Sequence, residues 1–312
     1  MVYLYANFFK NSNNFRIAAV AHVYVVRHHN VKFNLYFKAM TINCKGALID
    51  LSVPAVMGIL NVTPDSFFDG GRYKSDSDFL NQAESMLRDG ATFIDVGAYS
   101  SKPNADFVSE DEELSRIVPI VELLISNFPE ILLSIDTFRS AVAQNCIQYG
   151  AAIINDISAG HLDENMLPTV ARLQVPYIMM HMRGTPQTMQ SFTTYENIVQ
   201  EMLFYFSERV QQARLFGIND IIIDPGFGFA KTLDQNYEVL QKLELFSNID
   251  LPVLVGISRK SMIYKLLNSS AKEALNGTSI LNTIAIQKGA NILRVHNVRE
   301  AVECIKITQM LM

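Results

Sequence analysis

From about residue 55 the chain repeats one pattern: a short apolar run, a polar break and a longer amphipathic segment. The eight apolar runs are residues 56–62, 92–98, 131–137, 152–158, 177–182, 220–226, 252–258 and 291–297. Their apolar residues are continuous and do not alternate with polar ones. Such runs are typical of parallel strands that are covered on both faces.

The segments between the runs have the spacing of amphipathic helices. Residues 75–90 offer Ser75 as a helix cap, keep their apolar side chains on one face and end at Gly90. Residues 109–129 and 196–217 begin with acidic side chains, which the dipole of a helix favours at its amino end. The sequence therefore predicts a helix after most of the strands.

Eight strand–helix units in roughly 260 residues fit a single (β/α)₈ TIM barrel, an α/β fold. A doubly wound open sheet is the alternative. No GxGxxG or Walker-type loop follows the first strand, and no linker rich in Pro, Gly or Ser divides the chain. We therefore expect one barrel domain over residues 41–312.

The first 40 residues differ from the rest. They contain no Asp or Glu, are rich in Asn and aromatic residues, and hold three of the six histidines. Their apolar run at 17–26 is too short to span a bilayer, and no clear signal-peptide cleavage site follows it. We expect residues 1–40 to be a poorly structured extension, with Met40 as a candidate start of translation. His28 and His29 are then incidental and bind no metal.

Composition narrows the class of protein. Hydrophobic residues make up 49% of the chain and charged residues 18%, which suits a globular protein with a sizeable core. The formal net charge of −5 is mild, so neither nucleic acid nor a membrane is an expected partner. Cys44, Cys146 and Cys304 lie far apart and form no CxxC pair. This favours reduced thiols and a cytoplasmic location.

Every predicted strand ends in a polar residue. The set is Asn61, Asp95, Asp136, Asn155 with Asp156, His181, Asp224, Ser258 to Lys260, and Arg294 with His296. A single polar strand end needs no function, because Asp and Asn favour turns. A lone histidine among methionines, such as His181, is also more often a packing residue than a catalyst. Polar residues at all eight ends nevertheless indicate a binding site, since barrel enzymes place their chemistry at this end.

The kinds of side chain suggest the kind of ligand. Carboxylates and an amide suit a flat heterocycle with several N–H donors, such as an amino-pyrimidine, because they bind a planar donor edge in a bidentate manner. Arg294, His296 and the segment 70–72 provide an anion site near the last strand. The carbonyl oxygen of Asn61 suits a hard cation that keeps its waters. The ligand is therefore expected to be a heterocycle that carries a phosphate ester.

These residues lie in motifs that resemble those of one family. From about Val53 onward the chain closely resembles dihydropteroate synthases, through MGILNVTPDSFFDGG, IDVGAYSSKP, SIDT, INDIS, MMHMRGTPQTMQ, DPGFGFAK, SRKS and RVHN, in that order. The resemblance implies an enzyme of folate biosynthesis. It would join (7,8-dihydropterin-6-yl)methyl diphosphate to 4-aminobenzoate and release pyrophosphate. It also implies a homodimer that uses the last helices.

The resemblance also implies roles for individual residues. Asp136, Asn155, Met180, Asp224, Lys260 and Arg294 would bind the pterin. Asn61, Arg72, Arg294 and His296 would bind the diphosphate, with Mg²⁺ at Asn61. Thr63, Pro64, Ser101, Pro103, Phe229 and Ser261 would bind 4-aminobenzoate. The catalytic set would be Asp136, Lys260 and Asp95.

The expected chemistry needs no protein nucleophile. Loss of pyrophosphate leaves positive charge on the pterin methylene, which a fixed carboxylate such as Asp136 stabilises. Three positions depart from the usual family pattern: Lys102 replaces an arginine, Ala230 a glycine and Asn297 an aspartate. Lysine lacks the planar fork of arginine, so the sequence leaves open how a second loop with Lys102 organises the closed site.

Three other interpretations stay open at this point. A barrel aldolase would use Lys260 as a Schiff base, with Arg259 lowering its pKa by repulsion. A pterin-binding module for methyl transfer to a corrinoid shares the barrel, but it lacks the NVTPDSF segment and the SRK lysine. A paralogue without activity would bind pterin only, for which Lys102 leaves some room.

Overall fold

The structure is a computed structural model that describes residues 40–62, 75–99 and 107–311. The prediction for the amino-terminal extension therefore lies outside the described residues, apart from its last position, Met40.

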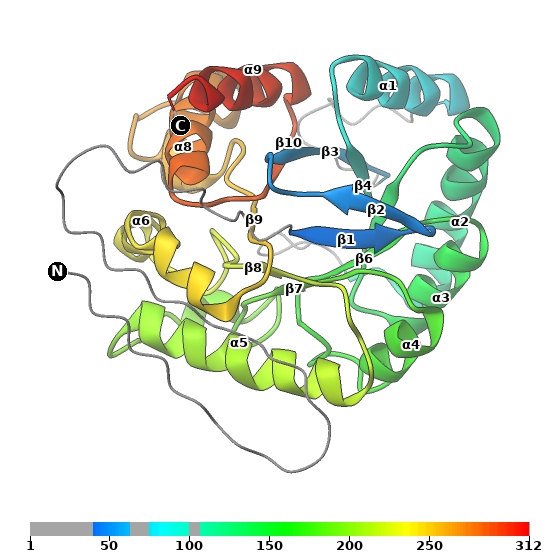
Figure 1. Cartoon of the computed structure of the whole chain (residues 1–312), viewed down its shortest axis with the longest axis horizontal. Helices are drawn as coiled ribbons and strands as arrows, with labels where there is room; N and C mark the ends of the chain where they lie inside the picture. Colours follow the sequence, from blue (N-terminus) through cyan, green and yellow to red (C-terminus); the bar gives the residue numbers. More distant parts are fainter. Residues whose placement is uncertain (1–39, 63–74, 100–106, 312) are drawn as a thin grey trace, which may run out of the picture. The chain divides into compact units, whose positions relative to one another are not determined.

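Eight parallel strands form the centre of the molecule (Figure 1). They are β3 (Ala55–Asn61), β4 (Phe93–Gly97), β5 (Leu133–Asp136), β6 (Ile153–Asp156), β7 (Tyr177–Met180), β8 (Ile221–Asp224), β9 (Leu254–Val255) and β10 (Ile292–Val295). Their order in the sheet is β8-β7-β6-β5-β4-β3-β10-β9, and a parallel bridge between Ile223 and Val253 joins the two ends. The predicted (β/α)₈ barrel is confirmed, and the open doubly wound sheet is wrong.

Helices follow the strands around the outside of the barrel (Figure 1). They are α1 (Asp76–Arg88), α2 (Glu110–Asn127), α3 (Ser140–Gln148), α4 (Met166–Leu173), α5 (Ile198–Leu215), α6 (Leu233–Gln241), α7 (Ser261–Tyr264), α8 (Leu275–Gln287) and α9 (Val298–Gln309). Short 3₁₀ helices lie at Met189–Ser191, Leu243–Ile249 and Ala271–Glu273. Ser75 caps α1 as its sequence predicts, in a capping box with Asp78.

The pleat of each strand separates two environments. In β4, Ile94 and Val96 belong to the large core between barrel and helices, together with Ile117 of α2. Phe93 belongs to a different cluster inside the barrel, and Asp95 shares its face because side chains alternate along a strand. A continuous apolar run can therefore carry a functional acid on its inner face without weakening the outer core.

A hairpin that the sequence analysis did not identify closes the amino end of the barrel. It consists of β1 (Thr41–Cys44) and β2 (Ala47–Asp50), joined by Lys45 and Gly46 at φ values of 53° and 85°. Two consecutive positive φ values are typical of the type I′ turn, which matches the twist of a two-stranded hairpin.

The hairpin packs against the inner face of the barrel strands. The apolar cluster that joins them contains Ile42, Cys44, Leu51, Ala55, Met57, Phe93, Ala152, Ile153, Ile178, Ile222, Leu254 and Ile292. The Asn291 side chain donates a hydrogen bond to the Leu51 carbonyl oxygen at 3.1 Å, and the Asn43 backbone N–H donates to Asp220 at 3.2 Å. This end of the barrel is therefore a sealed apolar core, and the polar residues lie toward the opposite end.

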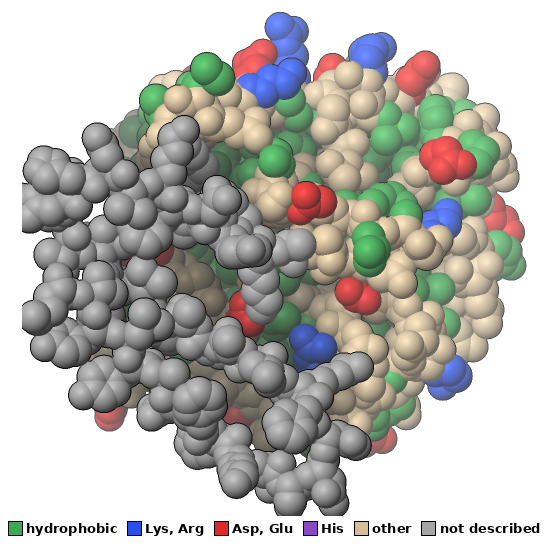
Figure 2. Space-filling model, in the orientation of Figure 1, with side chains coloured by type: hydrophobic (Ala, Val, Ile, Leu, Met, Phe, Trp, Pro, Cys, Tyr) green, Lys and Arg blue, Asp and Glu red, His purple; other side chains and the backbone are tan. Residues whose placement is uncertain are grey.

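The surface that surrounds the hairpin carries both signs of charge. In Figure 2, acidic and basic side chains are interspersed among apolar ones over the coloured part of this face.

The three cysteines are buried and unpaired, and burial raises the pKa of the Cys44 thiol to about 12. Among the described helices, none has the length and apolar character needed to cross a membrane.

The hairpin offers a test of its role in stability. Ile42 is 1% exposed, so Ile42→Ala leaves a cavity in the sealed end and should lower the free energy of unfolding by about 2–5 kcal/mol. Leu48 lies in the same hairpin but is 74% exposed, so Leu48→Ala should change it by no more than about 0.5 kcal/mol. Urea unfolding measures the free energy of unfolding of both variants. Equal losses would contradict the packing of the β1–β2 hairpin against the barrel strands.

Candidate active site

The polar residues of the site come from neighbouring strands. Asp136 pairs in register with Asn155 on β6, and Met180 of β7 pairs with Asp224 of β8. Asp95 lies in the middle of β4, next to β5. Because the strands are parallel and in register, their inner faces present these side chains to the same end of the barrel.

Arg294 on β10 holds two of the acids together. Its Nε lies 2.6 Å from Oδ2 of Asp95, and its terminal NH2 nitrogen lies 2.6 Å from Oδ2 of Asp136. The Asn155 amide also donates to Asp95 Oδ2, at 3.1 Å. The second oxygen of Asp95 is buried and has no hydrogen-bond partner among the described residues. One cation thus serves two carboxylates in the barrel interior.

The shared arrangement changes the acidity of these groups. Burial raises the pKa of Asp136 to about 7, although Arg294 favours its charged form. Burial opposes the charge of Arg294, but Asp95 and Asp136 together raise its pKa above the usual value. A charge on Asp136 is thus costly in the free protein, and a cationic partner is favourable there.

Two glycines lie beside these charges. A Cβ atom at Gly97 would lie 3.2 Å from Cβ of Asp136. A Cβ atom at Gly256 would lie 3.9 Å from both Cβ of Arg294 and Nζ of Lys260. A side chain at Gly97 would therefore crowd Asp136, whereas one at Gly256 would be in ordinary van der Waals contact with Arg294 and Lys260.

Asp224 and Lys260 form the other part of the site. Asp224 accepts a hydrogen bond from the Gly226 backbone at 2.7 Å, and burial raises its pKa while Lys260 lowers it. Burial lowers the pKa of Lys260 to about 8, and Asp224 opposes that change. The Lys260 ammonium donates to the Phe227 carbonyl oxygen and lies 4.9 Å from the ring centroid of Phe229.

An apolar wall lies next to the acids. Its buried members are Ile157, Met180, Met182, Met189 and Ala230, with Phe138, Leu162 and Phe229 packed against them. Met180 is 3% exposed. Methionine is polarisable and adapts to flat aromatic surfaces, so this wall suits one face of a planar ring.

Asn61 is the last residue of β3, and His296 directly follows the adjacent strand β10. Asn61 ends β3, and its side chain makes no hydrogen bond with other described residues. Nδ1 of His296 lies 3.0 Å from Oγ of Ser258. Ser261 is the first residue of α7, directly after Lys260. Thr63, Pro64, Arg72, Ser101 and Pro103 lie outside the described residues.

Two polar strand ends turn away from the site. Asp156 follows the inward-facing Asn155 and so points outward, where it accepts hydrogen bonds from Ser158, Gly160 and the Tyr177 hydroxyl. His181 is 2% exposed, and its ring packs edge-on to Tyr205 at 4.9 Å between centroids. Burial lowers the pKa of His181 well below its usual range. The contacts described for Asp156 and His181 are therefore with other parts of the protein and not with the residues of the site.

Arg259 also points away from Lys260. Its φ of 55° turns the chain, and its side chain donates to Asn297 at 2.8 Å and to the carbonyl oxygens of Ala271 and Lys272. The aldolase interpretation gave Arg259 the task of lowering the pKa of Lys260. Burial does so instead, and the cation that adds to it is Arg294. Asn297, where an acid was expected, still offers an oxygen that accepts the Arg259 hydrogen bond.

Ala230 has a backbone conformation that explains the usual glycine. Its φ is 47°, in the left-handed region, and it is fully buried. A side chain in this region costs roughly 1–2 kcal/mol. The chain therefore carries local strain in the loop between β8 and α6.

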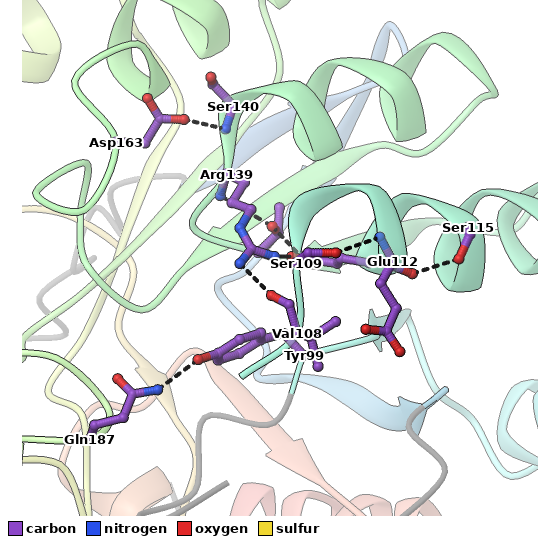
Figure 3. Close-up of polar contacts among 11 residues, drawn as sticks. Tyr99, Val108, Ser109, Glu112, Ser115, Arg139, Ser140, Asp163 and Gln187 are labelled. Atoms are coloured by element: carbon purple, nitrogen blue, oxygen red, sulfur yellow. Dashed lines mark hydrogen bonds and ion pairs between the residues drawn. The ribbon is translucent and has the colours of Figure 1, made fainter. Parts of the chain in front are cut away.

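Sequence reasoning missed a second charged cluster, at the start of α2 (Figure 3). Arg139 pairs with Glu113, which is fully buried, and donates to the Val108 carbonyl oxygen at 2.6 Å. The Thr137 hydroxyl donates to the same carboxylate at 2.7 Å. Glu113 looks like one of several acids that begin a helix, so its spacing in the sequence carries no signal of burial.

The cluster also collects aromatic rings. The Arg139 guanidinium lies 5.1 Å from the ring centroid of Phe138 and 5.5 Å from that of Tyr99. The Tyr99 hydroxyl accepts a hydrogen bond from Gln187 at 2.8 Å (Figure 3). Arg139 therefore joins the residues after β5 to the described residues on both sides of segment 100–106.

Comparison with known proteins agrees with this geometry. A family model described as a pterin binding enzyme matches residues 57–296. The dihydropteroate synthase of Haemophilus influenzae is 43% identical over 272 residues, which cover 86% of this chain and 98% of that protein.

Solved structures give the same result. A Yersinia pestis dihydropteroate synthase in a sulfonamide drug complex has a TM-score of 0.84 and 41% identity, over 87% of this chain and 99% of that one. A Xanthomonas albilineans dihydropteroate synthase with 4-aminobenzoic acid has a TM-score of 0.81 and 34% identity, over 88% and 98%.

A closed barrel with paired acids, a cationic partner and an apolar wall at its mouth defines the class of pterin-binding barrel enzymes. Within that class, the chain belongs to the dihydropteroate synthase family. It is a transferase of folate biosynthesis that condenses (7,8-dihydropterin-6-yl)methyl diphosphate with 4-aminobenzoate to give 7,8-dihydropteroate and pyrophosphate. The aldolase, methyl-transfer and inactive-paralogue interpretations are set aside.

The buried Arg139–Glu113 pair leads to a prediction with a close control. Arg139→Met leaves the Glu113 carboxylate buried without its cation and should lower the free energy of unfolding by about 3–5 kcal/mol. Arg116→Met removes the partner of Glu112 on the same helix, where the side chains are 23% and 48% exposed. That change should cost less than about 1 kcal/mol in urea unfolding. Similar losses in both variants would show that burial of the pair has no special importance.

Proposed function

We propose that the residues at the mouth of the barrel bind the pterin as the sequence predicts. The observation that supports this most directly is the Arg294 bridge between Asp95 and Asp136, with Asn155 and Asp224 on the same inner face. Carboxylate and amide oxygens accept hydrogen bonds from the amino-pyrimidine edge of a pterin. Met180 contributes the apolar face of the site.

In this proposal Asp136 stabilises the developing cation. The bond between the pterin methylene and the diphosphate oxygen breaks, and the diphosphate leaves with the electron pair. The amine of 4-aminobenzoate then forms the new C–N bond and loses a proton. A carboxylate already in place stabilises the positive methylene without reorganising, and such electrostatic effects are often the largest in catalysis. Lys260 binds the pterin beside Asp224, and Asp95 orients Arg294.

The diphosphate site combines Asn61, Arg72, Arg294 and His296. Mg²⁺ has few protein ligands in such sites and completes its coordination with water and phosphate oxygens, so one free amide oxygen at Asn61 is compatible with it. A cluster of three or more acidic, His or Cys ligands is absent from the described residues, which agrees with a cation held mainly by substrate. When bound, Mg²⁺ would neutralise charge on the departing pyrophosphate.

The 4-aminobenzoate site would lie beside Lys260. Phe229 is partly buried near the Lys260 ammonium, and Ser261 follows that lysine at the start of α7. An aromatic ring and a hydroxyl suit a flat acid with a polar end. Thr63, Pro64, Ser101 and Pro103 complete the proposed site and lie outside the described residues.

The pterin assignment is tested by a single acid. Asp224→Asn keeps the shape of the side chain but removes its charge, and it should weaken pterin binding about 10- to 100-fold, the value of a hydrogen bond to a charged group. Asp234→Asn, an exposed change at the start of α6, is the matched control and should have no effect. Calorimetry with the pterin diphosphate measures affinity, and pyrophosphate release with and without 4-aminobenzoate and Mg²⁺ measures turnover. Unchanged pterin affinity in Asp224→Asn would contradict the site.

The protein is further proposed to be a homodimer through its last helices. Ile280 on α8 and Ile307 on α9 are 52% and 65% exposed, and Leu266 and Leu267 before them are each 55% exposed. The two helices lie side by side (Figure 1), and Cys304 of α9 contacts the Ser279 carbonyl of α8 at 3.5 Å. Exposed apolar groups that lie close together are typical of an interface.

Sedimentation analysis tests the dimer. Ile280→Asp and Ile307→Asp place charge in the proposed interface and should convert the dimer to monomers of 35.1 kDa. Leu215→Asp changes an 81% exposed apolar residue at the end of α5 and should leave the dimer intact. A wild-type protein that sediments as a monomer at micromolar concentration would refute the proposal.

Two further assignments complete the proposal. Residues 41–312 would form the catalytic domain after an extension that ends near Met40. The location would be the cytoplasm, because the three buried thiols are all unpaired.

A further inference from the structure

Lys231 is a buried cation to which the proposed mechanism gives no role. It lies at the end of the loop between β8 and α6, just before the Thr232 cap of α6, and it is 4% exposed. It forms no ion pair with another described residue. Burial lowers the pKa of Lys231 to about 7, although Asp224 favours its charge. Keeping a lysine here is costly, so its contacts need an explanation.

Three acceptors surround the Lys231 ammonium. Nζ lies 3.0 Å from the Gly226 carbonyl oxygen, 3.0 Å from the Phe229 carbonyl oxygen and 3.1 Å from Nδ1 of His181. An ammonium has three N–H donors, so each can be used. Burial, together with Lys231 and Arg183, lowers the pKa of His181, which favours the neutral ring, and Nδ1 accepts in the tautomer protonated at Nε2. Lys231 thus ties both ends of segment 226–229 to the residue that follows β7.

The loop needs such an anchor. Gly226 lies so close to β7 that a Cβ atom there would be 2.3 Å from the His181 carbonyl oxygen. Ala230, next to Lys231, has a strained φ of 47°. A conformation with this close approach and strain persists only where surrounding contacts enforce it.

The same loop meets the reacting groups. The Phe227 carbonyl oxygen accepts the hydrogen bond of Lys260, and the Phe229 ring lies beside the Lys260 ammonium. Asp224 precedes the loop and is fixed by its Gly226 N–H. Asp224 is also the last residue of the barrel strand β8, whereas Phe229 lies within the loop, so a shift of the loop would move the Phe229 ring more than Asp224.

We infer that Lys231 is a positioning residue that fixes the Phe229 ring against Lys260 and so shapes the 4-aminobenzoate site. The inference rests on the proposed function, because it takes Phe229 as a wall of that site. Lys231 acts through the loop backbone and touches no substrate. Its removal should affect 4-aminobenzoate more than the pterin.

The test compares two lysines changed in the same way. Lys231→Met keeps the length of the side chain but removes the donors, and it should raise the KM for 4-aminobenzoate about 10-fold or more, the loss of one to two hydrogen bonds. The dissociation constant of the pterin diphosphate should rise less than the KM for 4-aminobenzoate, because Asp224 and Lys260 touch the loop but are not carried on it. Lys242→Met is the control. Lys242 follows α6 and forms an exposed ion pair with Glu238, so this variant should change neither the KM for 4-aminobenzoate nor the dissociation constant of the pterin diphosphate.

Two further variants distinguish positioning from general destabilisation. Lys231→Arg keeps the charge and the donors and should restore most of the KM. Lys231→Gln keeps two N–H donors, carries no buried charge and should give an intermediate KM, so it tests the inference even if Lys231→Met does not fold. An unchanged KM in folded Lys231→Gln and Lys231→Met would overturn the inference, as would equal losses for both substrates.

Phe229→Ala separates this inference from the proposal on which it rests. If Phe229→Ala leaves the KM for 4-aminobenzoate unchanged, the proposed 4-aminobenzoate site is wrong and the inference falls with it. If Phe229→Ala raises that KM and the Lys231 variants do not, the site stands and the role of Lys231 is wrong. A rise in both supports the two together.

Discussion

The site depends on how a barrel interior holds buried charge. Two carboxylates on neighbouring strands, Asp95 and Asp136, would repel each other in a medium of low polarity. Arg294 lies between them, and its planar guanidinium reaches both with separate N–H donors. The result is a pair of buried acids that share one cation, in which burial raises the pKa of Asp136 to about 7. A ligand that brings N–H donors, or that develops positive charge, is favoured in that environment.

The barrel separates this costly arrangement from the part that stabilises the fold. At the amino end, the β1–β2 hairpin joins the lower residues of the strands in a fully apolar cluster. On the outer face, the helices and strands share the large core. The inner residues near the carboxyl ends of the strands can then be acidic, because these two apolar clusters stabilise the fold. Asp95, two residues beyond Phe93 on the same face of one strand, marks the change from core to site.

Two buried cations donate hydrogen bonds to the backbone of loops near the site. Arg139 and Lys231 are both buried and both donate to main-chain carbonyl oxygens, at Val108 in one case and at Gly226 and Phe229 in the other. Loops that leave the end of a barrel strand cannot satisfy all their carbonyl groups within regular structure. A side chain with several N–H donors satisfies them and fixes the loop at the same time. In this barrel, Arg139 and Lys231 satisfy main-chain carbonyl groups of residues 108, 226 and 229 in this way.

The sequence by itself determined the repeated unit, the closed barrel and the polar residues at or after the strand ends, such as Asp136, Asn155, Asp224 and Lys260, because these depend on local periodicity and on motifs. The strand-end pattern alone could not decide between Asn155 and Asp156, and the choice of Asn155 came from the resemblance; the direction of the pleat in β6 is what puts one inside the barrel and the other outside. The partnership of Glu113 with Arg139 and of Lys231 with His181 was also decided by the tertiary structure. These pairs are 26 and 50 residues apart in the chain, and no local pattern records which buried donors and acceptors will meet once the strands are in register.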